Sequence, residues 1–263
     1  MDLSLKDKIA IVTGASKGIG RAIALSLAQE GCRVCVVART EATLNESRAE
    51  IQKLSNTEVM AVTGDVADPI LIAAVVRQVQ DRWGGVDILV HNAGGPPPGS
   101  FLEHGEDAWA LAINQNFLSA VRFSRAVVPG MKLKNWGRII CLTSTIAKEP
   151  TPQMVLSASA RAALAAFTKA IAAELAPFSI TVNTVCPGGV QTDRVELLMQ
   201  AAAKRESRTV DEIRKRSVAL IPSGRFASPA EVADVIAFLA SEKGSYVTGV
   251  SLMVDGGLTK SVF

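Results

Sequence analysis

Residues 8–20 read KIAIVTGASKGIG, and this stretch decides the fold. Its first part, up to Thr13, is a short apolar run of strand length, and a helical pattern begins just after Gly14, Gly18 and Gly20. Glycines at a strand-to-helix turn let the backbone approach a ligand, and the helix start offers free N–H groups to phosphate oxygens. The same glycines would also serve a tight turn without a ligand. Their place after the first strand of an alternating chain favours dinucleotide binding.

Apolar runs of strand length alternate with amphipathic helical stretches along the rest of the chain. This pattern is typical of repeated βαβ units and predicts a Rossmann-type, doubly wound α/β fold with a seven-stranded parallel sheet and helices on both faces. The expected strands are 8–13, 33–38, 58–62, 86–90, 139–142, 180–186 and 250–254, and the expected helices are 21–30, capped by Gly31, then 41–54, 69–83, 109–130, 154–176 and 229–240. No linker rich in Pro, Gly or Ser divides residues 1–263, so a single domain is expected.

One segment, about 192–220, is helical in pattern but contains no strand. We expect it to rise over the carboxyl edge of the sheet as a helical substrate lid. It carries the cations Lys204, Arg205, Arg208, Arg214, Lys215 and Arg216 against Glu206, Asp211 and Glu212. This excess could attract a phosphopantetheine, a coenzyme A or an acidic carrier protein, and a solvated helix face explains it equally well.

Composition and charge exclude several classes of protein. A net charge of +3 with dispersed Lys and Arg does not predict a nucleic-acid groove.

Cys32 and Cys35 have the spacing of a redox or zinc pair, but residues three apart on a strand point to opposite faces. Without a second pair or a His cluster, we expect buried structural thiols and no metal. No signal sequence and no apolar run of membrane-spanning length is expected, which predicts a soluble, cytoplasmic protein without a membrane partner.

The glycine spacing, T-G-x-x-x-G-x-G, resembles that of the short-chain dehydrogenase/reductase family. Further matches are Asp65-Val66, Asn92-Ala93-Gly94, Asn116, Pro187-Gly188 and Asp255-Gly256-Gly257, and the surrounding sequence is most similar to the β-ketoacyl carrier-protein reductases. The resemblance implies a cofactor site formed by Gly14, Ser16, Lys17, Gly18, Ile19, Gly20, Arg39, Asp65, Val66, Asn92, Ala93, Gly94, Pro187, Gly188, Val190 and Thr192. It also implies that Asp65 binds the adenine amino group and that Val190 and Thr192 contact the nicotinamide carboxamide.

The cofactor can be predicted from charge. An acidic residue at the end of the second strand would bind the ribose hydroxyls of NAD and repel a 2′-phosphate. Here Ala38 is followed by Arg39, and Lys17 lies in the glycine loop. Two cations and no carboxylate favour NADP(H), although Arg39 could also be a solvated charge at the end of a strand.

The catalytic positions depart from the family. Reduction of a ketone requires a proton as the hydride arrives, and the family is known for a Ser, a Tyr, a Lys and an Asn that serve this step. Ser144 and Asn116 match two of these roles, but Ser157 and Arg161 stand 13 and 17 residues after Ser144, where the Tyr and Lys belong. A Ser hydroxyl is a much weaker acid than a phenol. Arg161 lies one helical turn from Ser157, so it could present a cation to the nicotinamide ribose or to a substrate oxyanion.

Other proton donors are possible. His104, in the loop after the expected fourth strand, is the best by intrinsic pKa, and Lys148 and His91 are weaker candidates. The single Tyr, Tyr246, lies in a stretch that resembles the structural C-terminus of the family and is not expected to be a displaced catalytic residue.

Two functions therefore remain open. The first is an NADP(H)-dependent oxidoreductase with an atypical proton donor, acting on a carbonyl or hydroxyl substrate such as a 3-oxoacyl thioester. The second is a catalytically silent NADP(H)-binding protein. Retention of Ser144, Asn116 and the segment 187–192 favours the enzyme. The resemblance also implies a homodimer or homotetramer formed through helices rich in small residues.

Overall fold

Seven parallel strands form one sheet in the computed structural model, which describes residues 2–262. In chain order they are β1 (Ile9–Thr13), β2 (Arg33–Ala38), β3 (Val59–Thr63), β4 (Ile88–His91), β5 (Gly137–Leu142), β6 (Ile180–Pro187) and β7 (Ser251–Val254). Their order across the sheet is β3-β2-β1-β4-β5-β6-β7. The strand order therefore reverses beside β1, and this is the point where a crevice opens at the carboxyl ends of the strands.

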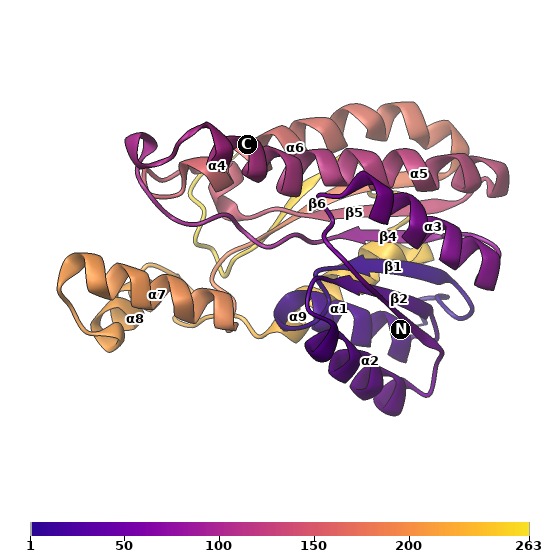
Figure 1. The fold of residues 1–263 in the computed structure, drawn as a ribbon, viewed down its shortest axis with the longest axis horizontal. Helices are drawn as coiled ribbons and strands as arrows, with labels where there is room; N and C mark the ends of the chain where they lie inside the picture. Colours follow the sequence, from indigo (N-terminus) through magenta and orange to yellow (C-terminus); the bar gives the residue numbers. More distant parts are fainter. Residues whose placement is uncertain (1, 263) are drawn as a thin grey trace.

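Helices cover both faces of the sheet (Figure 1). One layer holds α1 (Gly18–Gln29), α2 (Glu41–Ser55) and α9 (Pro229–Ala240), and the other holds α3 (Pro69–Trp83), α4 (Glu106–Ile113), α5 (Ser119–Lys134) and α6 (Val155–Leu175). Alternate residues of β1 lie on opposite faces of the sheet: Ala10 and Val12 pack with the first layer, and Ile9 and Ile11 pack with the second. The fold predicted from the alternation is thus confirmed. Short 3₁₀ turns are Phe101–Glu103, Thr145–Ala147, Ala176–Phe178 and Glu242–Gly244.

Two helices differ from their expected bounds. α1 begins at Gly18, earlier than expected, because its first turn is built from the glycine loop, whose low helix propensity hides it in the sequence. The stretch expected as one helix from 109 to 130 is α4, a π-helical turn at Asn114–Leu118 and α5. It continues past Pro129 and ends only where Asn135 adopts a left-handed conformation, with φ of 50°.

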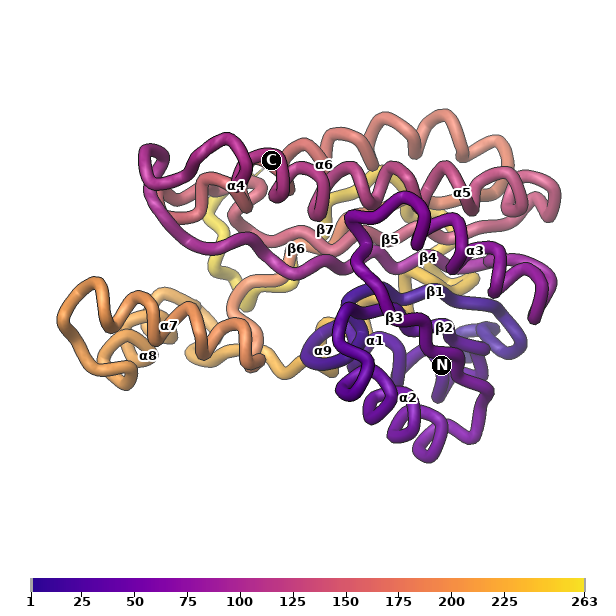
Figure 2. Tube along the Cα trace, viewed as in Figure 1, coloured from indigo at the N-terminus to yellow at the C-terminus, as the bar shows by residue number. Residues whose placement is uncertain are grey.

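Two helices, α7 (Asp193–Glu206) and α8 (Val210–Ala219), form the excursion expected at 192–220, and we keep the name lid for this segment. Both helices stand apart from the two layers, beyond the end of the sheet (Figures 1 and 2). They have a small apolar core of their own, in which Met199 and Ile213 pack with Phe226. α7 and α8 contact each other more than they contact any other helix or strand.

α6 corrects one expectation from the sequence. The segment Val155–Phe178 is long and apolar enough to cross a membrane, although no run of that length was expected. In the fold this helix packs on the sheet beside β6, and it buries Leu164 and Arg161. Its apolar composition is therefore explained as that of a core helix.

The cysteines behave as expected. All four are free and buried. Cys32 packs into the core on one face of the sheet and Cys35 into the core on the other, which rules out a shared metal or disulfide. Burial raises the pKa of the Cys35 thiol to about 12, so the thiol is unreactive at neutral pH. Among the residues that the structure describes, no cluster of His, Cys, Asp and Glu could hold a metal ion.

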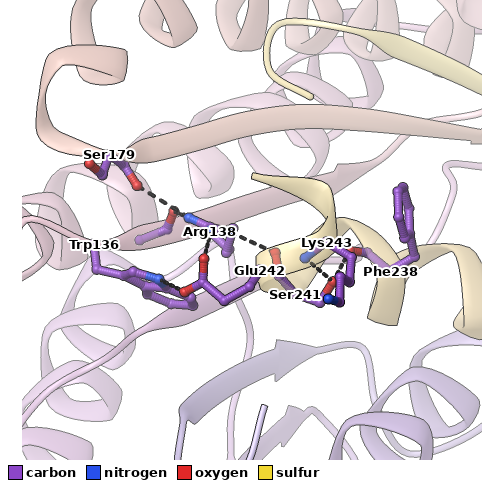
Figure 3. Close-up of polar contacts among 8 residues, drawn as sticks. Trp136, Arg138, Ser179, Phe238, Ser241, Glu242 and Lys243 are labelled. Atoms are coloured by element: carbon purple, nitrogen blue, oxygen red, sulfur yellow. Dashed lines mark hydrogen bonds and ion pairs between the residues drawn. The ribbon is translucent and has the colours of Figure 1, made fainter. Parts of the chain in front are cut away.

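A buried arginine ties the amino end of the sheet together (Figure 3). Arg138 on β5 is 1% exposed, and its guanidinium donates to the carbonyls of Gly137, Ser179 and Ser241 at 2.9, 3.2 and 3.3 Å. It also lies 3.5 Å from the Glu242 carboxylate. These contacts join β5, the start of β6 and the turn after α9, at the opposite end of the sheet from the crevice.

Candidate active site

A cavity of about 580 Å³ opens at the carboxyl ends of the strands. It is lined by residues from the loops after β1, β2, β3, β4, β5 and β6, which the fold brings to one edge. All the residues expected to bind the cofactor lie on its wall except Gly20, and they are joined there by Ser144, Ser157 and Arg161. Gly20 has a packing role instead, because a Cβ there would overlap the Gly14 carbonyl.

The glycine loop fits a dinucleotide phosphate. Lys17 at the N-cap of α1 makes no side-chain capping bond, and the first turn has no acidic residue, so the helix N–H groups remain available. Gly14 has a φ of +61°, and a Cβ on it would lie 2.5 Å from the carbonyl oxygen of Asn92. Asn92 holds the loop in place, because its amide donates to the Gly14 carbonyl at 3.2 Å.

The two cations expected to select NADP(H) both lie on the cavity wall. The Arg39 guanidinium is exposed and lies 4.0 Å from the Asp65 carboxylate, which leaves its other N–H groups in solvent. Lys17 forms an ion pair of 3.0 Å with Asp193 at the start of α7, so it links the glycine loop to the lid. Arg39 is therefore the freer of the two to meet a 2′-phosphate.

Arg161 does not point as the sequence led us to expect. Its Nη1 donates to the carbonyls of Leu142 and Thr143 at 3.1 and 2.8 Å, and its Nη2 donates to the carbonyl of Ala93 at 3.4 Å. Its Nε donates to the Ser157 hydroxyl at 3.1 Å. The guanidinium thus ties the ends of β4 and β5 together, and its N–H groups are largely used within the protein. This geometry does not support the expectation that Arg161 reaches out to the nicotinamide ribose.

Arg161 nevertheless remains a cation. Burial, and next the charge of Arg194, lower the pKa of its guanidinium to about 10, which still leaves it protonated at neutral pH. No carboxylate forms an ion pair with it among the residues that the structure describes. The cavity wall behind Ser157 therefore carries an uncompensated positive charge.

Asn116 does not lie on the wall of the cavity. It is buried in the π-helical turn, where its side-chain amide donates to the Ala112 carbonyl at 3.2 Å. Its Oδ1 is buried without a hydrogen-bond partner in the described protein. A buried carbonyl of this kind needs an ordered water, so Asn116 could act only through such a water.

The alternative proton donors are all displaced from the cavity. His91 and His104 do not line it, nor does Lys148, and Tyr246 is fully exposed at the surface. Burial lowers the pKa of His91 to about 3, so this imidazole is neutral, with its Nε2 2.7 Å from the Ser119 hydroxyl. Of the described residues that line the cavity, none is a His, Tyr or Cys.

Arg194 lines the cavity but was not among the site residues expected from the sequence. It follows Thr192 by two residues, on the first turn of α7, and its position after the 187–192 segment was the available signal. Its Nη2 donates to the Pro96 carbonyl at 2.6 Å across the mouth of the crevice. The guanidinium also lies beside Gly95, on the cavity wall.

Three of the six lid cations form ion pairs within the lid. Arg216 and Arg205 bind Glu206, and Arg214 binds Glu196 at 2.6 Å. Lys204, Arg208 and Lys215 are exposed and form no ion pair with a described residue, so an acidic partner and a solvated helix face both stay open as explanations.

Comparison with known proteins identifies the family of the chain. A family model described as Enoyl-(Acyl carrier protein) reductase matches residues 14–259. The 3-oxoacyl-(acyl-carrier-protein) reductase FabG of Vibrio cholerae is 38% identical over 256 residues, covering 97% of this chain and 99% of the relative.

Solved structures show the same similarity. L-sorbose reductase from Gluconobacter frateurii, in complex with NADPH and L-sorbose, is 34% identical with a TM-score of 0.95, covering 100% of both chains. A variant of actinorhodin polyketide ketoreductase with NADPH is 34% identical with a TM-score of 0.93, covering 98% of this chain and 99% of the other. The chain therefore belongs to the short-chain dehydrogenase/reductase family of oxidoreductases.

Proposed function

We propose that this chain reduces a ketone with NADPH, using two serine hydroxyls and a buried guanidinium where its family has a tyrosine and a lysine. The observation that carries the proposal is the position of Ser144, Ser157 and Arg161 on the same cavity wall as the glycine loop. The relatives described above are reductases, and two of their structures contain NADPH. The substrate is a 3-oxoacyl thioester or another small ketone.

The cofactor would be held by the glycine loop, by the free N–H groups of α1 and by Arg39. When bound, NADPH supplies the hydride. The remaining catalytic work of this chain is to orient the carbonyl and to stabilise negative charge on its oxygen as the hydride arrives.

Ser157 is suited to that work. Its oxygen accepts a hydrogen bond from Arg161, so its own O–H is left to donate into the cavity. Ser144 lies on the same wall, and its hydroxyl donates to no acceptor in the described protein. Two such donors beside a fixed cation resemble an oxyanion hole, in which one donor contributes roughly a factor of 10²–10³ in rate.

The final proton must come from elsewhere. No His, Tyr or Cys lies on the described cavity wall, and the Arg161 guanidinium remains charged at neutral pH. We infer that water protonates the product oxygen, with the water expected at Asn116 as one source. Losing a positioned general acid costs about 10²- to 10⁴-fold in rate, so the enzyme should be slow.

The same lack of an acid supports a second candidate, a silent NADP(H)-binding protein. An assay of NADPH oxidation distinguishes the reductase from the silent protein. The absorbance of NADPH at about 340 nm is followed with acetoacetyl-coenzyme A and with a panel of diketones and ketoses as substrates. Turnover that falls by about tenfold or more in both Ser144→Ala and Ser157→Ala would support the reductase. Tight NADPH binding without oxidation across the panel would establish the silent protein.

We also infer that the chain pairs with copies of itself through α6. The outward face of this helix exposes the small residues Ser159, Ala162, Ala166 and Ala170, which allow two helices to approach closely. Light scattering on the purified protein should give the mass of a dimer or tetramer, and Ala166→Glu should reduce this mass.

The location of the protein is inferred from its cysteines. The four buried free thiols suit the reducing cytoplasm expected from the sequence.

A further inference from the structure

We propose that the substrate carries a carboxylate and that Arg194 binds it, an inference that rests on the proposed reductase function. Two guanidinium groups face the cavity beside the loop that follows β4. Arg161 donates to the carbonyl of Ala93, and the Arg194 guanidinium lies next to Gly95. We call this part of the cavity, lined by Ser144, Ser157, Arg161 and Arg194, its serine end.

The serine end has no negative charge of its own. The only acidic residues on the described cavity wall are Asp65 and Asp193. Asp65 lies near Arg39, and Asp193 pairs with Lys17, so both are engaged at the nucleotide end. Arg161 and Arg194 form no ion pair with any described carboxylate, and the charge of Arg194 helps to lower the pKa of Arg161. Such a pair of partly or fully buried cations is stabilised by an anionic ligand.

Arg194 has more free N–H donors than Arg161. A guanidinium has five N–H donors in a planar fork, and four bonds to the protein already use most of those of Arg161. Arg194 makes one polar contact with the described protein, to the Pro96 carbonyl. A carboxylate would be a stronger acceptor than this neutral carbonyl, and it could accept two parallel bonds from the fork.

The position of Arg194 links this binding to the lid. It lies on the first turn of α7, and its contact with Pro96 spans the crevice from the lid to the loop after β4. A substrate carboxylate at Arg194 would add a ligand-mediated contact between the lid and the body. Arg194 is therefore a specificity-determining residue that favours keto acids over their neutral esters.

The test compares each acid with its own methyl ester. The probes are 3-oxobutanoate and 4-oxopentanoate, with their methyl esters, because they place the carboxylate at two distances from the ketone. For the wild type we expect kcat/KM with NADPH to favour at least one acid over its ester by about tenfold or more. Arg194→Gln should abolish this preference, mainly by raising the KM of the acid towards that of its ester. Arg194→Lys, which keeps the charge but loses the fork, should be intermediate.

A binding measurement keeps the inference separate from catalysis. Titration calorimetry of the same acids into the protein with NADP⁺ should show binding that weakens by about tenfold in Arg194→Gln. The control is Arg208→Gln, an exposed lid arginine outside the cavity, which should match the wild type. Circular dichroism on each variant establishes that it is folded.

The outcomes separate the two proposals. Equal use of acid and ester by the wild type would overturn the inference and leave the reductase standing. Binding of an acid that depends on Arg194, without any turnover, would support the inference and contradict the reductase. A loss of NADPH affinity in Arg194→Gln, with no change in the preference for acid over ester, would assign Arg194 to the cofactor phosphates and overturn the proposal.

Discussion

His91 should make the protein acid-sensitive, and the size of the effect follows from its burial. The side chain is 1% exposed at the end of β4, with its Nδ1 unpartnered in the described protein, and burial lowers its pKa from 6.5 to about 3. Below about pH 6.5 the His91 imidazole is protonated in the unfolded chain but stays neutral in the native protein. The free energy of unfolding therefore falls as the pH drops from about 6.5 towards about 3. At pH 5 the loss from this one group is about 2 kcal/mol relative to pH 7.5.

Urea unfolding of the wild type and of His91→Gln at both pH values measures this term. Glutamine removes the titration while keeping an amide that can reach the Ser119 hydroxyl. The decrease in unfolding free energy between pH 7.5 and pH 5 should be smaller in the variant by about 2 kcal/mol. Carboxylates contribute equally to both proteins and cancel in the difference. Parallel pH dependences, or an NMR signal of His91 that titrates near its ordinary pKa, would refute the reasoning and reopen His91 as a proton donor.

Three further variants test the cofactor site, the fold and the catalytic positions. Arg39→Asp should weaken NADPH binding by about tenfold or more and favour NADH, since it replaces a cation by an anion at the end of β2; titration calorimetry that finds equal affinities in the wild type would contradict the charge argument. Arg138→Met should lower the free energy of unfolding by about 3 kcal/mol, because three buried carbonyls lose their donor, and a change under about 1 kcal/mol in urea would show that the cluster is dispensable. The double variant Ser157→Tyr with Arg161→Lys should raise NADPH oxidation by about 10- to 100-fold if a positioned acid is what the site lacks, and unchanged turnover would place the limitation elsewhere.

Arg161 shows where prediction from the sequence stops. Its spacing from Ser144 and Ser157 predicted the catalytic positions and the absence of a tyrosine there. The spacing could not reveal that the guanidinium would turn away from the ribose. Its carbonyl acceptors, Leu142, Thr143 and Ala93, lie at or just after the ends of β5 and β4, some 18 to 68 residues away in the chain. Asn116 is similar: its motif placed it in the following helix, but the π-helical turn that sets its orientation has no clear pattern in the sequence.

The sequence by itself determined the sheet, its helices and the glycine loop, since period, turn residues and helix starts are set by near neighbours in the chain. Seven strands and the lid helices lie where the pattern placed them, apart from shifted ends. Only the tertiary structure decided the charge of the serine end. The Arg194 contact with Pro96 and the isolation of two cations from every described carboxylate depend on which loops the sheet brings together. The interaction energy of two charges depends on the distance between them in space, and no local stretch of sequence sets that distance.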